Sequence, residues 1–213
     1  MSHISLAESI KANNFSAVRH HVLVTGANVD EGDSLLYAVS RDFHDIAAFL
    51  ISCGANCNMK DSAGTSPLHF ASRVNNVVLM QELINAGASA TACDNAGLAP
   101  IHLAALYGWH EAVECLLRAG GDPTVCTPLG VSPLDLATRS LLRRTKGLFT
   151  AQTKLSEILD FRFDAKMMAN ELNMSNPSLI NIAGNPQVKK LQRAIKMLEA
   201  SSRAHVKSRL NGR

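Results

Sequence analysis

The chain has 213 residues, a formal net charge of +3 and a hydrophobic fraction of 46%. This length suits one elongated domain, or one domain with an appendage, and the hydrophobic fraction is enough for a continuous core. Aromatic residues make up only 5%, which favours helices that pack through Ala, Leu and Val. No N-terminal segment combines a charged start with an apolar core, and no apolar run is long enough to cross a membrane. We therefore expect neither a secretion signal nor a transmembrane segment.

The five cysteines do not form a disulfide or zinc pattern. Cys53 and Cys57 lie four residues apart, like half of a zinc site, but a structural zinc site commonly takes its four ligands as two close pairs. Cys93, Cys115 and Cys126 supply no second pair. We expect free thiols, no metal, and a reducing compartment, either cytoplasm or nucleus.

The N-terminal part divides into residues 1–30 and residues 31–60, each of which reads as two short helices. In 1–30 the apolar positions have helical spacing and are Leu6, Ile10, Phe15, Val18, Val22 and Leu23. This segment lacks a preceding turn, so we expect a divergent capping repeat with a polar outer surface. In 31–60, Ser34 precedes the first helix where later copies have proline.

Residues 61–93 and 94–126 are two copies of one unit. Five residues of the first recur 33 positions later, as Gly64/Gly97, Pro67/Pro100, Leu68/Ile101, Ala71/Ala104 and Gly87/Gly120. Within the unit, Asp94 to Gly97 has turn chemistry, and Pro100 suits the first turn of a helix. Gly108 ends that helix, and Gly120 ends the next. A fixed period of this kind predicts a stack of identical helical pairs.

The period and the Ser-Pro-Leu-His-Phe-Ala sequence at 66–71 resemble the ankyrin repeat over residues 5–140. The resemblance implies an all-α solenoid in which each turn is followed by two antiparallel helices. It also implies that function lies on a concave face, which grips protein partners. We expect four leucines to be buried in the core of the stack: Leu68, Leu103, Leu116 and Leu134.

The pattern changes after residue 126. Residues 127–174 are predicted to contain a divergent fifth repeat, starting at Pro133, and a closing helix over 153–174. Residues 175–186 read as a linker, and 187–213 as a basic amphipathic helix. From residue 186 onward there are eight Lys or Arg and one Glu, a net charge of +7, so residues 1–185 carry −4. The helix can dock on the repeats through its apolar stripe, or bind nucleic acid or an anionic membrane.

Two histidines, His69 and His102, follow the Pro-Leu and Pro-Ile pairs of successive repeats. Metal binding and acid–base catalysis both use histidine, but the 33-residue phase makes each of these a structural copy within its own repeat. The resemblance implies a hydrogen bond to the neighbouring turn. Asp135 replaces the histidine in the fifth copy, and Ala99 lacks the hydroxyl of Ser66. With no phosphate loop, nucleophile elbow or paired carboxylates, we expect no enzyme activity and no cofactor.

The predicted function is that of a non-catalytic adaptor, scaffold or regulator in protein–protein interaction. Mapped by the repeat phase, the candidate partner-binding residues are Arg41, Arg73, Val74, Asn95, Leu98, Leu106, Tyr107, Trp109 and Arg139. Arg and Tyr are enriched at interface hot spots. The mixture of cationic and apolar residues on this surface predicts a protein partner with an acidic or mixed acidic–apolar patch. The alternative is association with nucleic acid or an anionic membrane through residues 187–213.

Overall fold

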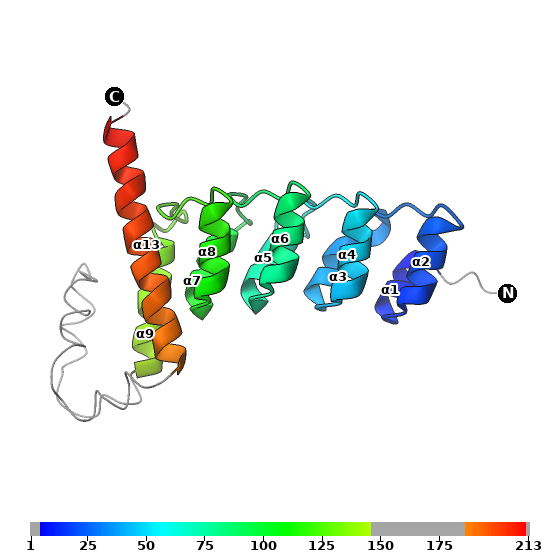
Figure 1. Ribbon diagram of the computed structural model, residues 1–213, viewed down its shortest axis with the longest axis horizontal. Coiled ribbons are helices and arrows are strands. Elements are labelled where there is room, and N and C mark those ends of the chain that lie inside the picture. Colours follow the sequence, from blue (N-terminus) through cyan, green and yellow to red (C-terminus); the bar gives the residue numbers. More distant parts are fainter. Residues whose placement is uncertain (1–4, 146–185, 212–213) are drawn as a thin grey trace.

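A computed structural model describes residues 5–145 and 186–211, which are helical and contain no strand. Figure 1 shows helical pairs standing side by side along one axis. The helices are α1 (Leu6–Lys11), α2 (Phe15–Leu23), the 3-10 turn η1 (Glu31–Asp33), α3 (Ser34–Ser40), α4 (His44–Ser52), α5 (Pro67–Val74), α6 (Val77–Asn85), α7 (Pro100–Tyr107), α8 (His110–Arg118), α9 (Pro133–Thr145) and α13 (Pro186–Asn211). The predicted all-α solenoid is confirmed.

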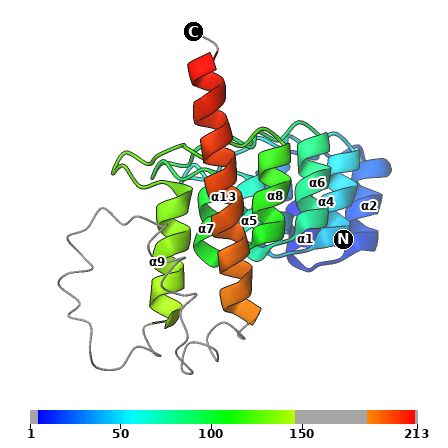
Figure 2. The same ribbon diagram turned by 60° about the vertical axis from the view of Figure 1, so that its left-hand side comes forward.

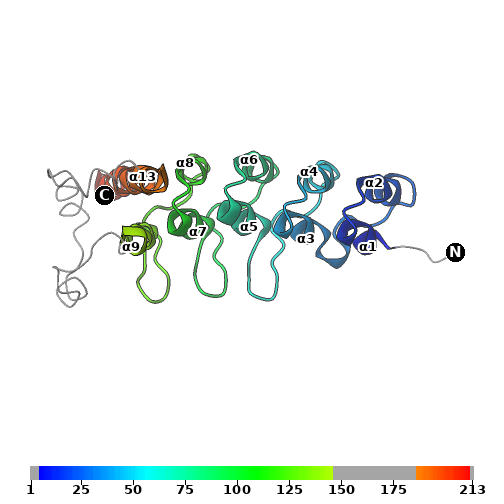
Figure 3. The ribbon, with the colours of Figure 1, turned by 90° about the horizontal axis from the view of Figure 1, so that it is seen from below.

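The helices form two rows. Seen from below in Figure 3, α1, α3, α5, α7 and α9 make an inner row, and α2, α4, α6 and α8 make an outer row. Three long loops, here called fingers 1, 2 and 3, project from the inner row and span residues 53–66, 86–99 and 119–132. The inner helices and fingers together make the inner face of the stack.

The turn from each inner helix to its outer helix requires a left-handed backbone. Asp42, Asn75 and Gly108 occupy this position, with φ of 60°, 60° and 75°. Asp, Asn and Gly tolerate this conformation better than other residues do. The turns recur 33 residues apart, which sets the repeat of the stack.

The core lies between the two rows, where both helices of a pair present small or branched apolar residues. Leu68 and Leu116 are fully buried, as predicted. Leu103 and Leu134 are only half-buried, so the prediction for these two is wrong. Leu103 lies on the side of α7 that faces away from the outer row and is covered by no further layer of the described stack. Leu134 packs against the core at the position of Leu68 and Ile101, but it belongs to α9, beyond which the described residues place no further inner helix.

The first two fingers are joined by hydrogen bonds from one repeat to the next. The backbone N–H of Asn95 donates to the carbonyl of Ala63 at 2.9 Å, and its side-chain amide donates to the carbonyl of Ser62 at 3.0 Å. The Lys60 ammonium donates to the carbonyl of Cys93 at 2.8 Å. These bonds fix the spacing of neighbouring fingers.

The N-terminal end differs from the expected polar cap. α1 begins with a capping box, in which Ser5 and Glu8 exchange side-chain to backbone hydrogen bonds. On α2 and just after it, however, Phe15, Leu23 and Val24 are 40%, 59% and 70% exposed. The outer helix of the first repeat therefore carries an apolar surface, although Phe15 also packs edge-on against Phe49 of α4.

The fifth repeat is completed from a distant part of the chain. α9 runs on through Leu141, the position at which α7 has the turn residue Gly108. α13 takes the next place in the outer row and lies alongside α9 and α8 (Figure 2). Its buried residues are Leu191, Ala194 and Leu198. The closing helix predicted over 153–174 and most of the predicted linker lie outside the described residues.

Within residues 5–145 and 186–211, no helix combines the length and the apolar character that a membrane span requires.

Candidate functional site

Three arginines of the predicted site are exposed on the inner row: Arg41, Arg73 and Arg139. The Arg41 guanidinium lies 5.4 Å from the ring centroid of Tyr37, and that of Arg73 lies 5.0 Å from the ring centroid of Phe70. Among the described residues, none of the three arginines forms an ion pair with a carboxylate. The aromatic rings orient two of the guanidinium groups, and their charges stay available to an external group.

Apolar side chains lie among these arginines. Val74 is 47% exposed, Tyr107 is 37% exposed, and Leu106 is half-buried. Sequence reasoning missed a further row of half-buried positions on the inner helices, 33 residues apart: Tyr37, Phe70, Leu103 and Leu136. The repeat phase held the signal for this row, because the four residues occupy the same position in successive copies. The inner face thus combines cationic groups with partly exposed apolar and aromatic groups.

The finger residues of the predicted site have structural partners. Asn95 is exposed but bonds to the first finger, as described above. The Leu98 N–H donates to Asp94 Oδ1 at 2.8 Å, and the Leu98 carbonyl lies 2.9 Å from His69 Nε2. Only their outward-facing atoms can meet a partner. At the tip of finger 3, Leu129 is 90% exposed.

Trp109 lies apart from the inner face, in the turn that leads into α8. Its indole N–H donates to the carbonyl of Arg73 in the preceding repeat at 3.0 Å. The Lys190 ammonium of α13 lies 5.6 Å from the centroid of its ring. Both interactions belong to the protein itself, so Trp109 links the third repeat, the fourth repeat and α13.

The two repeat histidines join successive repeats. His69 Nδ1 accepts a hydrogen bond from the Ser66 N–H at 3.2 Å, and Nε2 donates to the Leu98 carbonyl at 2.9 Å. In the next copy, His102 Nδ1 accepts from the Ala99 N–H at 3.0 Å, and Nε2 donates to the Val131 carbonyl at 3.3 Å. A carbonyl can only accept, so Nε2 carries the proton in both rings. The structural interpretation of these histidines is confirmed.

The fifth copy retains only the local part of this arrangement. The Asp135 carboxylate accepts from the Ser132 N–H at 2.9 Å and from the Ser132 hydroxyl at 2.7 Å. Asp135 therefore caps α9, whereas His69 and His102 also reach a following finger.

We expect the stability of the protein to fall in mild acid because of His69 and His102. Burial is the main cause that lowers the pKa of both imidazoles from 6.5. Below about pH 6.5 the unfolded chain therefore binds protons that the folded protein does not, and the free energy of unfolding decreases as the pH falls. Urea denaturation at pH 7.5 and 5.5 checks this, with a His69→Gln, His102→Gln variant as control. The variant should be less stable at pH 7.5 and should lose less stability on acidification; an equal loss would contradict the assignment.

The cysteines and other potential ligands form no metal site in the described part of the chain. Within residues 5–145 and 186–211, no three or more His, Cys, Asp or Glu side chains come together as a candidate site. Cys57 and Cys115 are buried, and burial raises the pKa of both thiols. A raised pKa keeps these thiols protonated and weakly nucleophilic.

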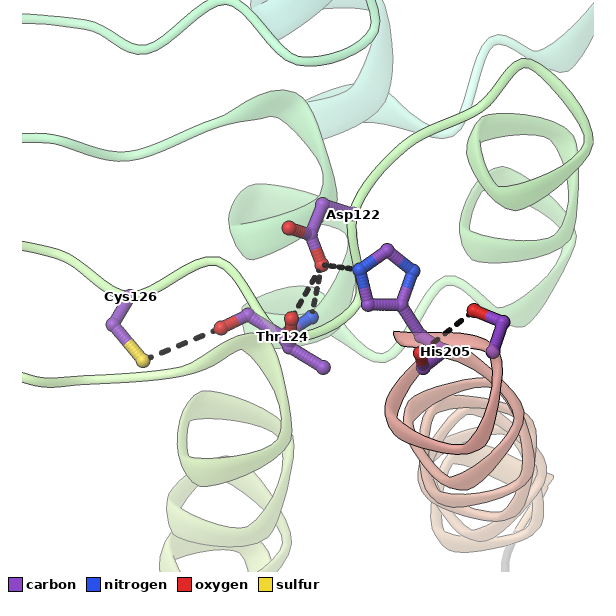
Figure 4. Close-up of polar contacts among 5 residues, drawn as sticks. Asp122, Thr124, Cys126 and His205 are labelled. Atoms are coloured by element: carbon purple, nitrogen blue, oxygen red, sulfur yellow. Dashed lines mark hydrogen bonds and ion pairs between the residues drawn. The ribbon is translucent and has the colours of Figure 1, made fainter. Parts of the chain in front are cut away.

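α13 contacts the stack through its apolar stripe near its start and through a histidine farther along. Near its start, Leu191 packs on the turn at Gly108, where an added Cβ would lie 2.4 Å from Leu191 Cγ. Farther along, His205 Nε2 lies 3.8 Å from a carboxylate oxygen of Asp122, which follows α8 (Figure 4). Asp122 also accepts hydrogen bonds from the N–H and hydroxyl of Thr124. Contacts therefore extend along the helix from Lys190 to His205.

Family comparisons agree with this architecture. A family model described as "Ankyrin repeats (many copies)" matches residues 50–104, and one described as "Ankyrin repeat" matches residues 96–128. Together they cover the chain from the end of α4 to finger 3. A search of curated proteins found no match. The chain is an ankyrin-repeat protein.

Proposed function

We propose that the protein is a non-catalytic adaptor or regulator that holds a protein partner on its inner face. Ankyrin repeats generally mediate protein–protein interactions and are typically non-catalytic. The observation that carries the proposal is the set of exposed arginines on the inner row, Arg41, Arg73 and Arg139, which have no carboxylate partner among the described residues.

The chemistry of this face favours a partner with an acidic or mixed acidic–apolar patch. An arginine stacked on an aromatic ring has already lost part of its side-chain freedom, so it gives up less entropy when a carboxylate binds it. Val74 and Tyr107 supply partly exposed apolar surface beside the arginines. Charge attraction would raise the association rate, and apolar contact would slow dissociation.

A double change on the inner face should abolish partner binding while the fold is retained. We expect Arg73→Glu with Tyr107→Ala to lower capture of the main partner from native extract at least tenfold, mostly through faster dissociation. Both side chains are exposed, so the melting temperature should shift by only a few degrees. Pull-down with quantitative mass spectrometry, followed by dissociation kinetics with the captured partner, measures the effect.

A control at the outer row makes this result interpretable. Val78 is 63% exposed on α6, so Val78→Asp changes the charge and apolar area of the opposite row and should leave capture unchanged. Deletion of residues 186–213 is a poor control, because it would uncover the surface on which Leu191 packs. Capture that survives the inner-face change and is lost with Val78→Asp would contradict the proposal.

The basic helix supports a second candidate function, association with nucleic acid or an anionic membrane through α13. Residues 186–213 carry a net charge of +7, and the apolar stripe of α13 is buried against the repeats. Lys189, Arg193, Lys196, Arg203 and Lys207 therefore remain exposed on the outward side of the helix. For the compartment we propose cytoplasm or nucleus, since all five cysteines are free thiols.

A further inference from the structure

The exposed side of α13 carries its cations in one straight row, here called the cationic stripe. The residues of the stripe are Lys189, Arg193, Lys196, Arg203 and Lys207, and all are exposed. Their spacing along the chain is four, three, seven and four residues, and Ala200 fills the seven-residue gap. At 3.6 residues per turn these positions fall within about 80° of the helix circumference. At about 1.5 Å per residue, the stripe is about 27 Å long.

The docking of α13 produces this stripe. Leu191, Ala194 and Leu198 are fully buried on one side of the helix, and the stripe occupies the opposite side. Lys190 lies off the stripe and over the Trp109 ring. Glu199 lies at the edge, 3.6 Å from Arg203, whose side chain is still 71% exposed. Solvent around the exposed guanidinium weakens this single pair, so the stripe contains no carboxylate that neutralises it strongly.

We infer that the cationic stripe binds the phosphate backbone of a duplex nucleic acid. This inference rests on the second candidate function and is independent of the inner face. A duplex carries one negative charge per about 1.7 Å of its axis, so about 16 charges lie along a length equal to that of the stripe. The duplex therefore offers more phosphates than the stripe has cations, so each of the five cations can contact a phosphate along one duplex.

The composition of the stripe argues against the other anionic surfaces. A surface helix binds a membrane by burying its apolar side in the lipid boundary, but that side of α13 is already buried against α8 and α9. A single-stranded nucleic acid requires aromatic side chains for base stacking, and the stripe has none. Recognition by charge alone remains, which predicts binding that does not depend on base sequence.

Salt dependence gives the inference a numerical test. Five phosphate contacts predict a slope of about −4.5 for log affinity against log salt, so affinity should fall about 500-fold between 50 and 200 mM salt. The test uses the full chain and a labelled DNA duplex of about 20 base pairs, which is longer than the stripe. Fluorescence anisotropy at several salt concentrations measures the slope.

Two variants with the same change of net charge distinguish phosphate contacts made by the stripe from attraction due to the overall charge of the protein. Lys189→Gln with Lys196→Gln should reduce the slope to about −2.7, since each lost contact removes about 0.9. Lys11→Gln with Arg19→Gln, which removes exposed cations of α1 and α2 at the other end of the stack, should leave the slope at about −4.5. Equal slopes for the two variants would overturn the inference.

Competing occupants and the inner-face proposal are tested in the same assay. Binding to phosphatidylserine vesicles without binding to the duplex would overturn the inference, as would displacement of the duplex by oligoglutamate at equal charge concentration. The Arg73→Glu, Tyr107→Ala variant should bind the duplex like the parent. Loss of duplex binding in that variant would mean that the inner face, and not the stripe, holds the duplex.

Discussion

Leu116→Ala should lower the free energy of unfolding by about 2–5 kcal/mol. Leu116 is fully buried in α8, a helix that lies between its outer-row neighbours α6 and α13 and packs on its own inner helix α7. Removal of its side chain leaves a cavity that the surrounding helices cannot close completely. Because each repeat is stabilised by its neighbours, the loss should affect the whole stack. Urea denaturation followed by circular dichroism measures the change.

Leu103→Ala is the matched control for this prediction. Leu103 is also a leucine of the fourth repeat, but it is half-buried on the inner face. Its truncation removes less buried area, so the free energy of unfolding should fall by clearly less than in Leu116→Ala. Equal losses for the two variants, or a Leu116→Ala transition that overlaps that of the parent, would contradict the assignment of the core.

Leu191→Ala should separate α13 from the end of the stack. Leu191 is fully buried and packs against the backbone of the turn at Gly108, which has no side chain. We expect the free energy of unfolding of α13, and of the helices on which it packs, to fall by about 2–5 kcal/mol. Amide hydrogen exchange should become faster in α13 and α9, whereas exchange in α3 and α4 should change little, because repeats interact mainly with their neighbours.

Two further variants define the cause of this effect. Val206→Ala changes an apolar residue of the same helix that is 51% exposed, and it should leave exchange unchanged. Gly108→Ala should reproduce the effect of Leu191→Ala, since its Cβ would lie 2.4 Å from Leu191 Cγ and the backbone φ there is +75°. If amide hydrogen exchange in α13 is the same in Leu191→Ala as in the parent, the docking of the helix does not depend on this contact.

The repeated part of the fold could be predicted from the sequence because its signals are local. Pro67 and Pro100 start inner helices, and Gly108 supplies the left-handed turn between the helices of the fourth repeat. His69 could be assigned a structural role because His102 repeats it in phase. Each of these inferences needs only a short stretch of sequence and its copy one period away.

The end of the stack could not be predicted in the same way. The position of α13 depends on packing between residues about 80 apart in the chain, such as Gly108 and Leu191. The 33-residue repeat pattern does not indicate such long-range contacts. Residues 153–174 also carry an apolar pattern, so the sequence offers more than one segment for the last place in the outer row. The half-burial of Leu103 was missed for a related reason. An apolar residue with helical spacing can still lie on the side of an inner helix that faces away from the outer row.

The candidate site was predictable only in part. The phase of Arg73 and Tyr107 correctly indicated exposed positions on the inner row, because exposure follows from the repeat geometry. A single tryptophan in a turn between helices favours packing against a neighbouring repeat, and Trp109 does bond to Arg73 of the preceding repeat. Its contact with Lys190 depends on the docking of α13 and could not be predicted from the sequence. The aromatic rings of Tyr37 and Phe70 beneath the arginines were overlooked, although the spacing of four and three residues within a helix could have indicated them.

Site-specific photo-crosslinking tests the central claim, that a protein partner lies on the inner face. A photoreactive phenylalanine analogue replaces Tyr107 on the inner row in one protein and Val78 on the outer row in another; these side chains are 37% and 63% exposed. Each protein is irradiated in native extract, and crosslinked products are identified by mass spectrometry. We expect position 107 to crosslink the main partner strongly and position 78 to crosslink it weakly or not at all. A partner that crosslinks from position 78 and not from position 107 would contradict the claim.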